Sequence, residues 1–232
     1  MEEEEVILFN LMKKISLRKR FKRLKWAIVI DPGHGGRDPG AVNKKYGYEE
    51  KDINLHVADY MREYINDRVP ELNAFYTRHM DWTVSLPERC RFANGTETSF
   101  FGKKIDAFIS IHTNARVLKG RYGLEIETYY FRNSEPGFEL AASVQRELLA
   151  IGVHYDLPVI DRGVKVGQRR GRDGELKDFY VLRKTHMPAI LVELGFLSDD
   201  EEAQLLVKSE NQEIMAQAIV DGVVKWLEEK DG

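Results

Sequence analysis

The spacing of hydrophobic residues divides the chain after residue 25 into short buried strands and longer amphipathic helices. Runs that are almost wholly apolar and bounded by turn residues are typical of strands buried on both faces, and they occur at 27–30, 72–77, 106–113 and 189–194. Apolar residues that recur at helical spacing, or serines in capping positions, predict helices over 48–69, 85–94, 139–153, 198–206 and a final segment from 209. This alternation predicts one α/β domain with a three-layer fold, in which a twisted, mostly parallel (mixed) sheet carries helices on both faces.

Two further segments have a shorter or weaker strand pattern. Residues 123–131 alternate between apolar and polar positions, which predicts a strand with one solvated face. Glu125 and Glu127 lie on the polar side of this alternation, so we expect both to be exposed. The short run 179–182 predicts one more strand.

The stretch 161–178 is rich in glycine and arginine and predicts a loop. Most such loops are mobile connections. The alternative is that Arg169 and Arg170 contact an anionic substrate.

Candidate chemistry begins where the first strand ends, in the sequence AIVIDPGHGGRDPGAV (27–42). The glycines allow a tight loop around His34, at the strand end where open α/β sheets usually bind ligands. His112 ends the 106–113 strand in the same way, and Glu50 lies on the inward stripe of the 48–69 helix. A histidine among glycines can be purely structural, but two histidines and a glutamate are also the ligands that a catalytic zinc takes while keeping a position for water.

Glu193 interrupts an otherwise apolar strand near its carboxyl end. A carboxylate at such a position is costly unless a metal, a water or hydrogen-bond donors meet it. The alternative is a buried pair with a cation such as Arg183.

The composition excludes several classes of protein and of metal site. The chain has 232 residues, 43% of them hydrophobic, which is enough for one domain with a proper core. A net charge of −3 gives no indication of nucleic-acid binding. Cys90 is the single cysteine, so an internal disulfide and a cysteine-rich metal cluster are both excluded. No stretch approaches the length of a membrane span, and the glutamate-rich start is unlike a secretory signal.

Residues 1–25 differ from the rest and are interpreted as a charged extension to a domain at 26–230. Residues 13–25, KKISLRKRFKRLK, are dense in lysine and arginine. They form either a solvated, partly helical segment or a basic surface for an anionic wall polymer or membrane.

Residues 26–229 closely resemble the catalytic domain of zinc-dependent N-acetylmuramoyl-L-alanine amidases of the third amidase family, which includes bacterial cell-wall amidases and phage endolysins. The matching segments are IDPGHGGRDPGAV, EEKDINL, TRHMDWTVSLPERCRFAN, DAFISIHTNA and FYVLRKTHMPAILVELGFLSDDEEAQLL. The resemblance implies that His34, Glu50 and His112 bind one Zn²⁺, that Glu193 is catalytic, and that peptidoglycan is the substrate. The 163–178 segment is longer than is usual in the family.

Several expectations follow with less support from the sequence. Asn114, beside His112, is a candidate substrate contact. Asp31 is a candidate to orient the metal-bound His34 by a hydrogen bond to its ring. Without an export signal, the protein should accumulate in the cytoplasm and act on the wall after release, as an endolysin does. The alternatives are a zinc peptidase or carboxypeptidase cutting within the stem peptide, and a non-catalytic wall- or nucleic-acid-binding protein acting through residues 13–25.

Overall fold

The computed structural model describes residues 24–99, 104–116, 122–171 and 174–232. Its centre is a six-stranded sheet with the strand order β2-β1-β3-β8-β4-β5. The strands are β1 (Trp26–Pro32), β2 (Leu72–Tyr76), β3 (Ala107–Asn114), β4 (Leu124–Tyr130), β5 (Val159–Val166) and β8 (Ala189–Phe196). All neighbouring strands are parallel except β4 and β8, which are antiparallel. The predicted mostly parallel, mixed sheet is therefore confirmed.

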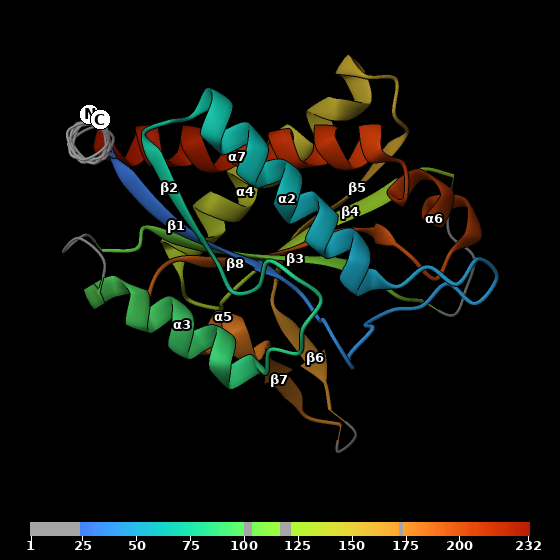
Figure 1. Ribbon diagram of the computed structural model, residues 1–232, viewed down its shortest axis with the longest axis horizontal. Helices are drawn as coiled ribbons and strands as arrows, with labels where there is room; N and C mark the ends of the chain where they lie inside the picture. The colour runs from blue at the N-terminus through green and yellow to red at the C-terminus, as the bar shows by residue number, and fades with distance from the viewer. Residues whose placement is uncertain (1–23, 100–103, 117–121, 172–173) are drawn as a thin grey trace, which may run out of the picture.

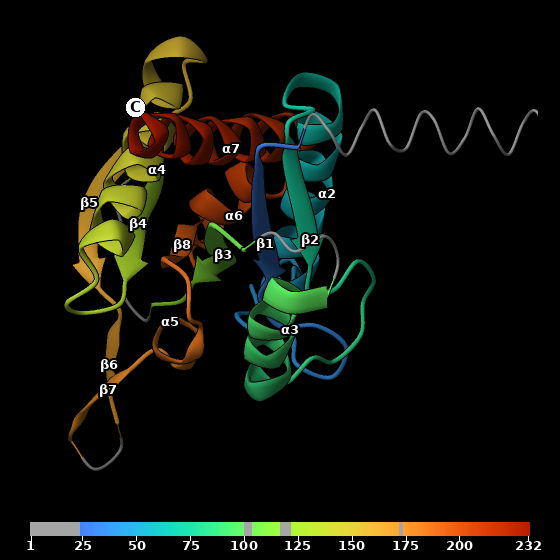
Figure 2. The same cartoon turned by 90° about the vertical axis from the view of Figure 1, so that its left-hand side faces the viewer.

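Helices cover both faces of this sheet, which gives the three layers visible in Figures 1 and 2. One face carries α2 (Glu50–Arg68), α4 (Glu135–His154) and α7 (Ser209–Asp231), and the other carries α3 (Leu86–Ser99) and α5 (Tyr180–Lys184). The short helix α6 (Asp200–Leu206) follows the carboxyl end of β8. No helix in the described part of the chain is long and apolar enough to cross a membrane.

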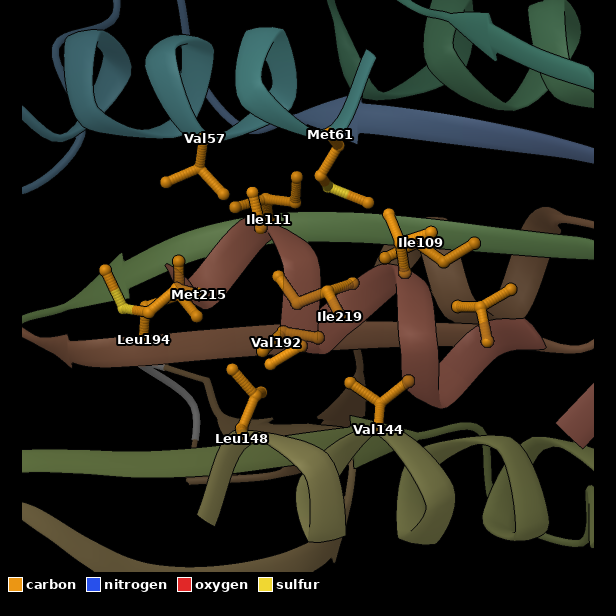
Figure 3. Close-up of a cluster of buried hydrophobic side chains, with 14 of the residues drawn as sticks. Val57, Met61, Ile109, Ile111, Val144, Leu148, Val192, Leu194, Met215 and Ile219 are labelled. Atoms are coloured by element: carbon orange, nitrogen blue, oxygen red, sulfur yellow. The ribbon is translucent and has the colours of Figure 1, made fainter. Parts of the chain in front are cut away.

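The main core lies between the sheet and the layer of α2, α4 and α7 (Figure 3). Side chains of β3 and β8 meet the apolar stripes of the three helices there, and the residues labelled in the figure are 0% exposed. These stripes are the ones that the helical spacing predicts, with Val57 and Met61 on α2 and Met215 and Ile219 on α7. The helices are therefore held by the burial of those faces.

Close approach of α4 and α7 depends on Gly222. A Cβ atom at Gly222 would lie 2.6 Å from the Cα atom of Val144, and backbone atoms cannot yield as a flexible side chain can. We expect Gly222→Ala to lower the free energy of unfolding by about 2 kcal/mol, measured by urea denaturation. Gly95→Ala on α3, where a Cβ meets nothing within 4 Å, is the control and should raise it by roughly 0.5 kcal/mol. Equal effects of the two changes would contradict this account of the α4–α7 contact.

The prediction of a loop at 161–178 is wrong. The segment contributes the end of the edge strand β5 and then a hairpin of β6 (Gln168–Arg170) and β7 (Leu176–Asp178). An edge strand needs apolar residues on only part of its surface, so charged residues do not prevent β5 from pairing with β4.

The strand predicted at 179–182 is also wrong, because residues 180–184 form the helix α5. A short apolar run fits a buried helical turn as well as a strand, and periodicity cannot separate the two. At the next helix, α6, Asp199 rather than Ser198 accepts hydrogen bonds from the first-turn amides.

The expectation that Glu125 and Glu127 are exposed is wrong as well. They are 5% and 1% exposed on β4. Arg162 donates to both carboxylates, at 2.8 and 2.7 Å, and Arg116 and Lys165 add further ion pairs. The polar side of the alternation therefore faces cations and not water.

The charged extension lies largely outside the described residues, which begin at Leu24. Of the predicted basic segment 13–25, Lys25 pairs with Asp231 at the end of α7, with 3.1 Å between Nζ and Oδ2.

Candidate metal centre and active site

The loop after β1 places His34 by a backbone conformation that its glycines permit. His34 itself has a φ of 61°, in the left-handed region. A Cβ atom at Gly33 would lie 2.3 Å from the His112 ring, and one at Gly40 would lie 2.4 Å from Glu50 Oε2. Glycine at these two positions therefore lets the loop close over the two other candidate ligands.

Two buried arginines bind the backbone of this loop. Arg78 donates to the carbonyl oxygens of Pro32 and Gly33, each at 2.9 Å. Arg89 donates to the carbonyl oxygens of Pro32 and His34, at 2.8 and 2.6 Å. A guanidinium with several donors in a fixed geometry suits this role, because one arginine can bind two backbone carbonyl oxygens of the loop at once.

The structure brings together His34 from the loop after β1, Glu50 from the first turn of α2 and His112 from β3. One ligand atom from each residue lies within 4.8 Å of the other two. Glu50 Oε1 is 3.2 Å from His34 Nε2 and 2.9 Å from His112 Nδ1. Ligands of a tetrahedral zinc at its usual bond lengths lie about 3.3 Å apart, so this nitrogen and oxygen donor set fits a zinc ion.

Glu50 is held as a carboxylate. Ala41 N donates to Oε2 at 2.7 Å, and Thr113 N donates to Oε1 at 3.1 Å. Burial by itself favours the neutral acid, but hydrogen bonds and charge interactions with His112 and His34 outweigh it and hold the pKa of Glu50 well below its ordinary value. A charged carboxylate is the form that binds a metal.

Asp38, and not Asp31, contacts the His34 ring. The distance from His34 Nδ1 to Asp38 Oδ2 is 2.8 Å. Burial lowers the pKa of His34, but its contacts with Glu50 and Asp38 raise it above the ordinary value overall. Asp31 is fully buried and instead accepts hydrogen bonds from Thr77, Arg89 and Ser110. The expected orienting role of Asp31 is therefore corrected, since its carboxylate binds the arginine that supports the loop.

We expect Asp38→Asn to weaken metal binding by about 10- to 100-fold, the usual effect of removing a carboxylate that orients a metal-binding histidine. The measurement is competition with a zinc chelator. Folding should be unaffected because Asp38 is exposed. An unchanged affinity would mean that the loop alone orients His34.

Glu193 lies beside His112 on the same face of the sheet. The two residues are register partners on β8 and β3, and Glu127 on β4 is the register partner of Glu193 on its other side. Glu193 Oε2 is buried and has no hydrogen-bond partner among the described residues. Burial raises the pKa of Glu193 well above its ordinary value, and the carboxylates of Glu50 and Glu127 raise it further. An unpaired carboxyl group with a raised pKa is suited to proton transfer.

The structure shows what contacts two further residues named from the sequence, Arg183 as an alternative partner of Glu193 and Asn114 as a candidate substrate contact. Arg183 does not pair with Glu193, and its guanidinium lies over the Tyr180 ring at 5.9 Å. The Asn114 amide donates to Glu127 Oε1 at 2.7 Å, so Asn114 belongs to the polar row next to Glu193.

Arg169 and Arg170 lie exposed on the β6–β7 hairpin, which extends away from the sheet in Figure 2. The Arg170 guanidinium donates to the Gly174 carbonyl oxygen within the hairpin at 2.8 Å. The structure therefore gives these two arginines no contact with the metal-binding group.

Sequence reasoning missed the residues that support the site. Arg78 and Arg89 lie in a segment that resembles the family, but the sequence analysis assigned neither residue a role. Asp38 could have been found from its position four residues after His34 in a tight loop, whereas nothing local indicates that Arg89 reaches residue 34.

Comparisons with known proteins identify the family of the chain. A family model described as N-acetylmuramoyl-L-alanine amidase matches residues 28–225. The uncharacterized protein YqiI of Bacillus subtilis is 34% identical over 87% of this chain and 85% of its own length. The amidase LytC of the same organism is 33% identical over 86% of this chain, which spans only 35% of LytC. The crystal structure of an N-acetylmuramoyl-L-alanine amidase from Clostridium difficile 630 is 32% identical, covers 88% of this chain and 98% of that one, and has a TM-score of 0.73.

Proposed function

Because the chain belongs to the N-acetylmuramoyl-L-alanine amidase family, we propose that it binds zinc through His34, Glu50 and His112. We propose that it then hydrolyses the amide bond between the lactyl group of N-acetylmuramic acid and the first L-alanine of the peptidoglycan stem peptide. The observation that carries this proposal is the register of β3 and β8. It sets the unpaired Glu193 carboxyl group directly beside His112, one of the three clustered donors.

Glu193 and Asp38 have different roles in the proposed hydrolysis. A zinc ion, when bound, supplies a Lewis acid that polarises a carbonyl group and lowers the pKa of water. Glu193 accepts a proton from the attacking water, whose oxygen bonds to the lactyl carbonyl carbon. The C–N bond then breaks, and Glu193 returns the proton to the alanine amine as it leaves. Asp38 keeps the His34 ring in its binding orientation.

Product analysis of digested muropeptides tests the proposal. An amidase releases intact stem peptides with a free L-alanine amine and leaves lactyl carboxyl groups on the glycan. Fragments cut within the stem would instead support the zinc peptidase or carboxypeptidase, and new reducing sugar ends would indicate a glycosidase. Either result, from metal-loaded protein, would overturn the proposed bond specificity.

The lytic, endolysin-type role and the cytoplasmic accumulation stay predictions. So does binding of an anionic wall polymer or membrane by residues 13–25. Deleting residues 1–23 separates the last of these from catalysis: an amidase needs only the domain, whereas a binding protein that acts through the basic segment would lose its function.

A further inference from the structure

A hollow is formed by segments that follow β1, β3 and β8, the strands next to the candidate metal centre, and no step of the proposed reaction uses it. It is an open cleft of about 660 Å³, within the range of small-ligand sites. Its walls come from the loop between β1 and α2, the residues after β3, the residue before β4, and α6. Two aromatic rings line it: Tyr122 is 66% exposed, and Tyr46 is 39% exposed and stacks on Tyr48 with 5.5 Å between the ring centres. We refer to it as the tyrosine cleft.

The tyrosine cleft is close to the metal-binding residues along the backbone. Arg116 in its wall is four residues after His112, so their Cα atoms are at most about 14 Å apart. Tyr46 lies in the loop whose base is the hydrogen bond from Glu50 N to Ala41 O, at 2.9 Å. Asn43 fixes this loop to α6, because its side chain donates to Leu197 O and Asp200 Oδ1 at 3.0 and 3.1 Å. A chain-like substrate bound at the metal can therefore extend into the cleft.

The charges of the cleft balance. Three carboxylates and three cations line it, from Asp199, Asp200, Glu201, Lys45, Arg116 and Lys208. Several are already paired with one another, as in the contacts of Arg116 with Asp199 and of Lys45 with Asp200, both at 3.4 Å. Such a surface gives a ligand with net charge as much repulsion as attraction, so it does not favour charged ligands. A neutral, hydroxyl-rich ligand meets no net repulsion and can form hydrogen bonds with the polar groups.

A row of paired charges on β4 and β5 borders the cleft. Arg116 in the cleft wall and Arg162 on β5 both donate to Glu125, at 2.7 and 2.8 Å, and both guanidinium groups lie over the Phe196 ring. Arg162 and Lys165 also contact Glu127. The cations that border the cleft are therefore already paired with carboxylates, as the charges that line it are.

We propose that the tyrosine cleft binds the glycan strand of the substrate, with the Tyr46 and Tyr122 rings packing against sugar rings on the far side of the scissile amide from the stem peptide. The proposal rests on the proposed function and names the part of the substrate that the cleft recognises. Sugar rings have apolar C–H faces and polar edges, which match exposed aromatic rings set among balanced polar groups.

The test varies the glycan length and the peptide length of the substrate independently. Four soluble substrates carry one or four sugar rings and a three- or five-residue stem peptide, and kcat/KM is measured for the full, metal-loaded chain. Tyr46→Ala and Tyr122→Ala should each lower kcat/KM about fivefold on the two four-ring substrates, and leave the one-ring substrates within twofold. Phe138→Ala is the matched control, because Phe138 is 47% exposed but lies in the first turn of α4 and packs against Tyr130, at the far end of β4 from Tyr122.

A binding measurement separates this proposal from the proposed function. The tetramer of N-acetylglucosamine, which has no peptide or scissile bond, is titrated against the chain by NMR, and both tyrosine variants should weaken its binding about fivefold. Hydrolysis of all four substrates with no binding of the tetramer and no dependence on glycan length would overturn the glycan site and leave the amidase proposal standing. Losses that follow peptide length, or that are equal on all substrates, would also overturn it. Tetramer binding by a chain that cleaves none of the substrates would support the cleft and refute the amidase.

Discussion

Glu193→Gln should abolish turnover while leaving the metal in place. We expect kcat to fall about 10³-fold, within the range of general acid–base contributions, and zinc content to stay near one ion per chain. Glutamine keeps the size of the side chain and removes only its capacity to accept the proton. The measurements are stem-peptide release from muropeptides and the metal content of the same preparation.

The structure also predicts that this variant folds normally. Glu193 Oε2 has no hydrogen-bond partner among the described residues, and burial together with Glu50 and Glu127 raises the pKa of Glu193, so the charged form is destabilised in the fold. A neutral amide removes that repulsion, so the free energy of unfolding of the metal-free chain should stay the same or rise. An inactive but unfolded variant would therefore count against the assignment.

Arg183→Ala is the control for the alternative view of Glu193. Had the two residues formed a buried pair, the change would leave a buried carboxylate without its partner and lower the free energy of unfolding by several kcal/mol. Arg183 is exposed and lies over the Tyr180 ring, so the change should leave activity and stability nearly unchanged. Turnover by Glu193→Gln at a rate close to that of the original chain would refute the role of Glu193 as a base.

The candidate ligands could be predicted from the sequence because each one violates a simple pattern. His34 follows one apolar strand, His112 lies near the end of another, and Glu50 is a carboxylate at the buried first position of α2. Parallel strands bring such ends to one edge of the sheet, so a topology of the correct class was enough to bring these residues close together.

The wrong predictions concern residues whose partners are distant in sequence. Glu127 looks like a solvent-facing position of an alternating strand, and only the return of the chain in β5, 35 and 38 residues later, supplies Arg162 and Lys165. Asp31 is adjacent to the metal loop in sequence, but its side chain points to Arg89, 58 residues away. Periodicity reports which face of an element a residue occupies, and it carries no information on what covers that face.

Glu50→Gln should remove the metal itself. Of the three candidate ligands, Glu50 is in contact with both others, and its Oε1 atom lies within 3.2 Å of a nitrogen of each histidine. An amide oxygen is a far weaker ligand for zinc than a carboxylate, so we expect zinc affinity to fall by more than about 100-fold, beyond the loss caused by removing an outer partner such as Asp38. Activity should be lost with the metal and return in part when zinc is added in excess, a recovery that Glu193→Gln cannot show.

The neighbouring residue gives a matched control for this change. Glu49→Gln makes the same chemical substitution one position earlier, but the Glu49 carboxylate pairs with Lys51 at 3.2 Å and is not part of the donor cluster. It should keep its zinc and its activity. Because the two variants differ only in which side of the α2 amino terminus loses a carboxylate, equal zinc binding by both would show that the cluster at His34, Glu50 and His112 is not the metal site. Loss in Glu50→Gln alone would assign the metal to the position where β1, β3 and α2 meet.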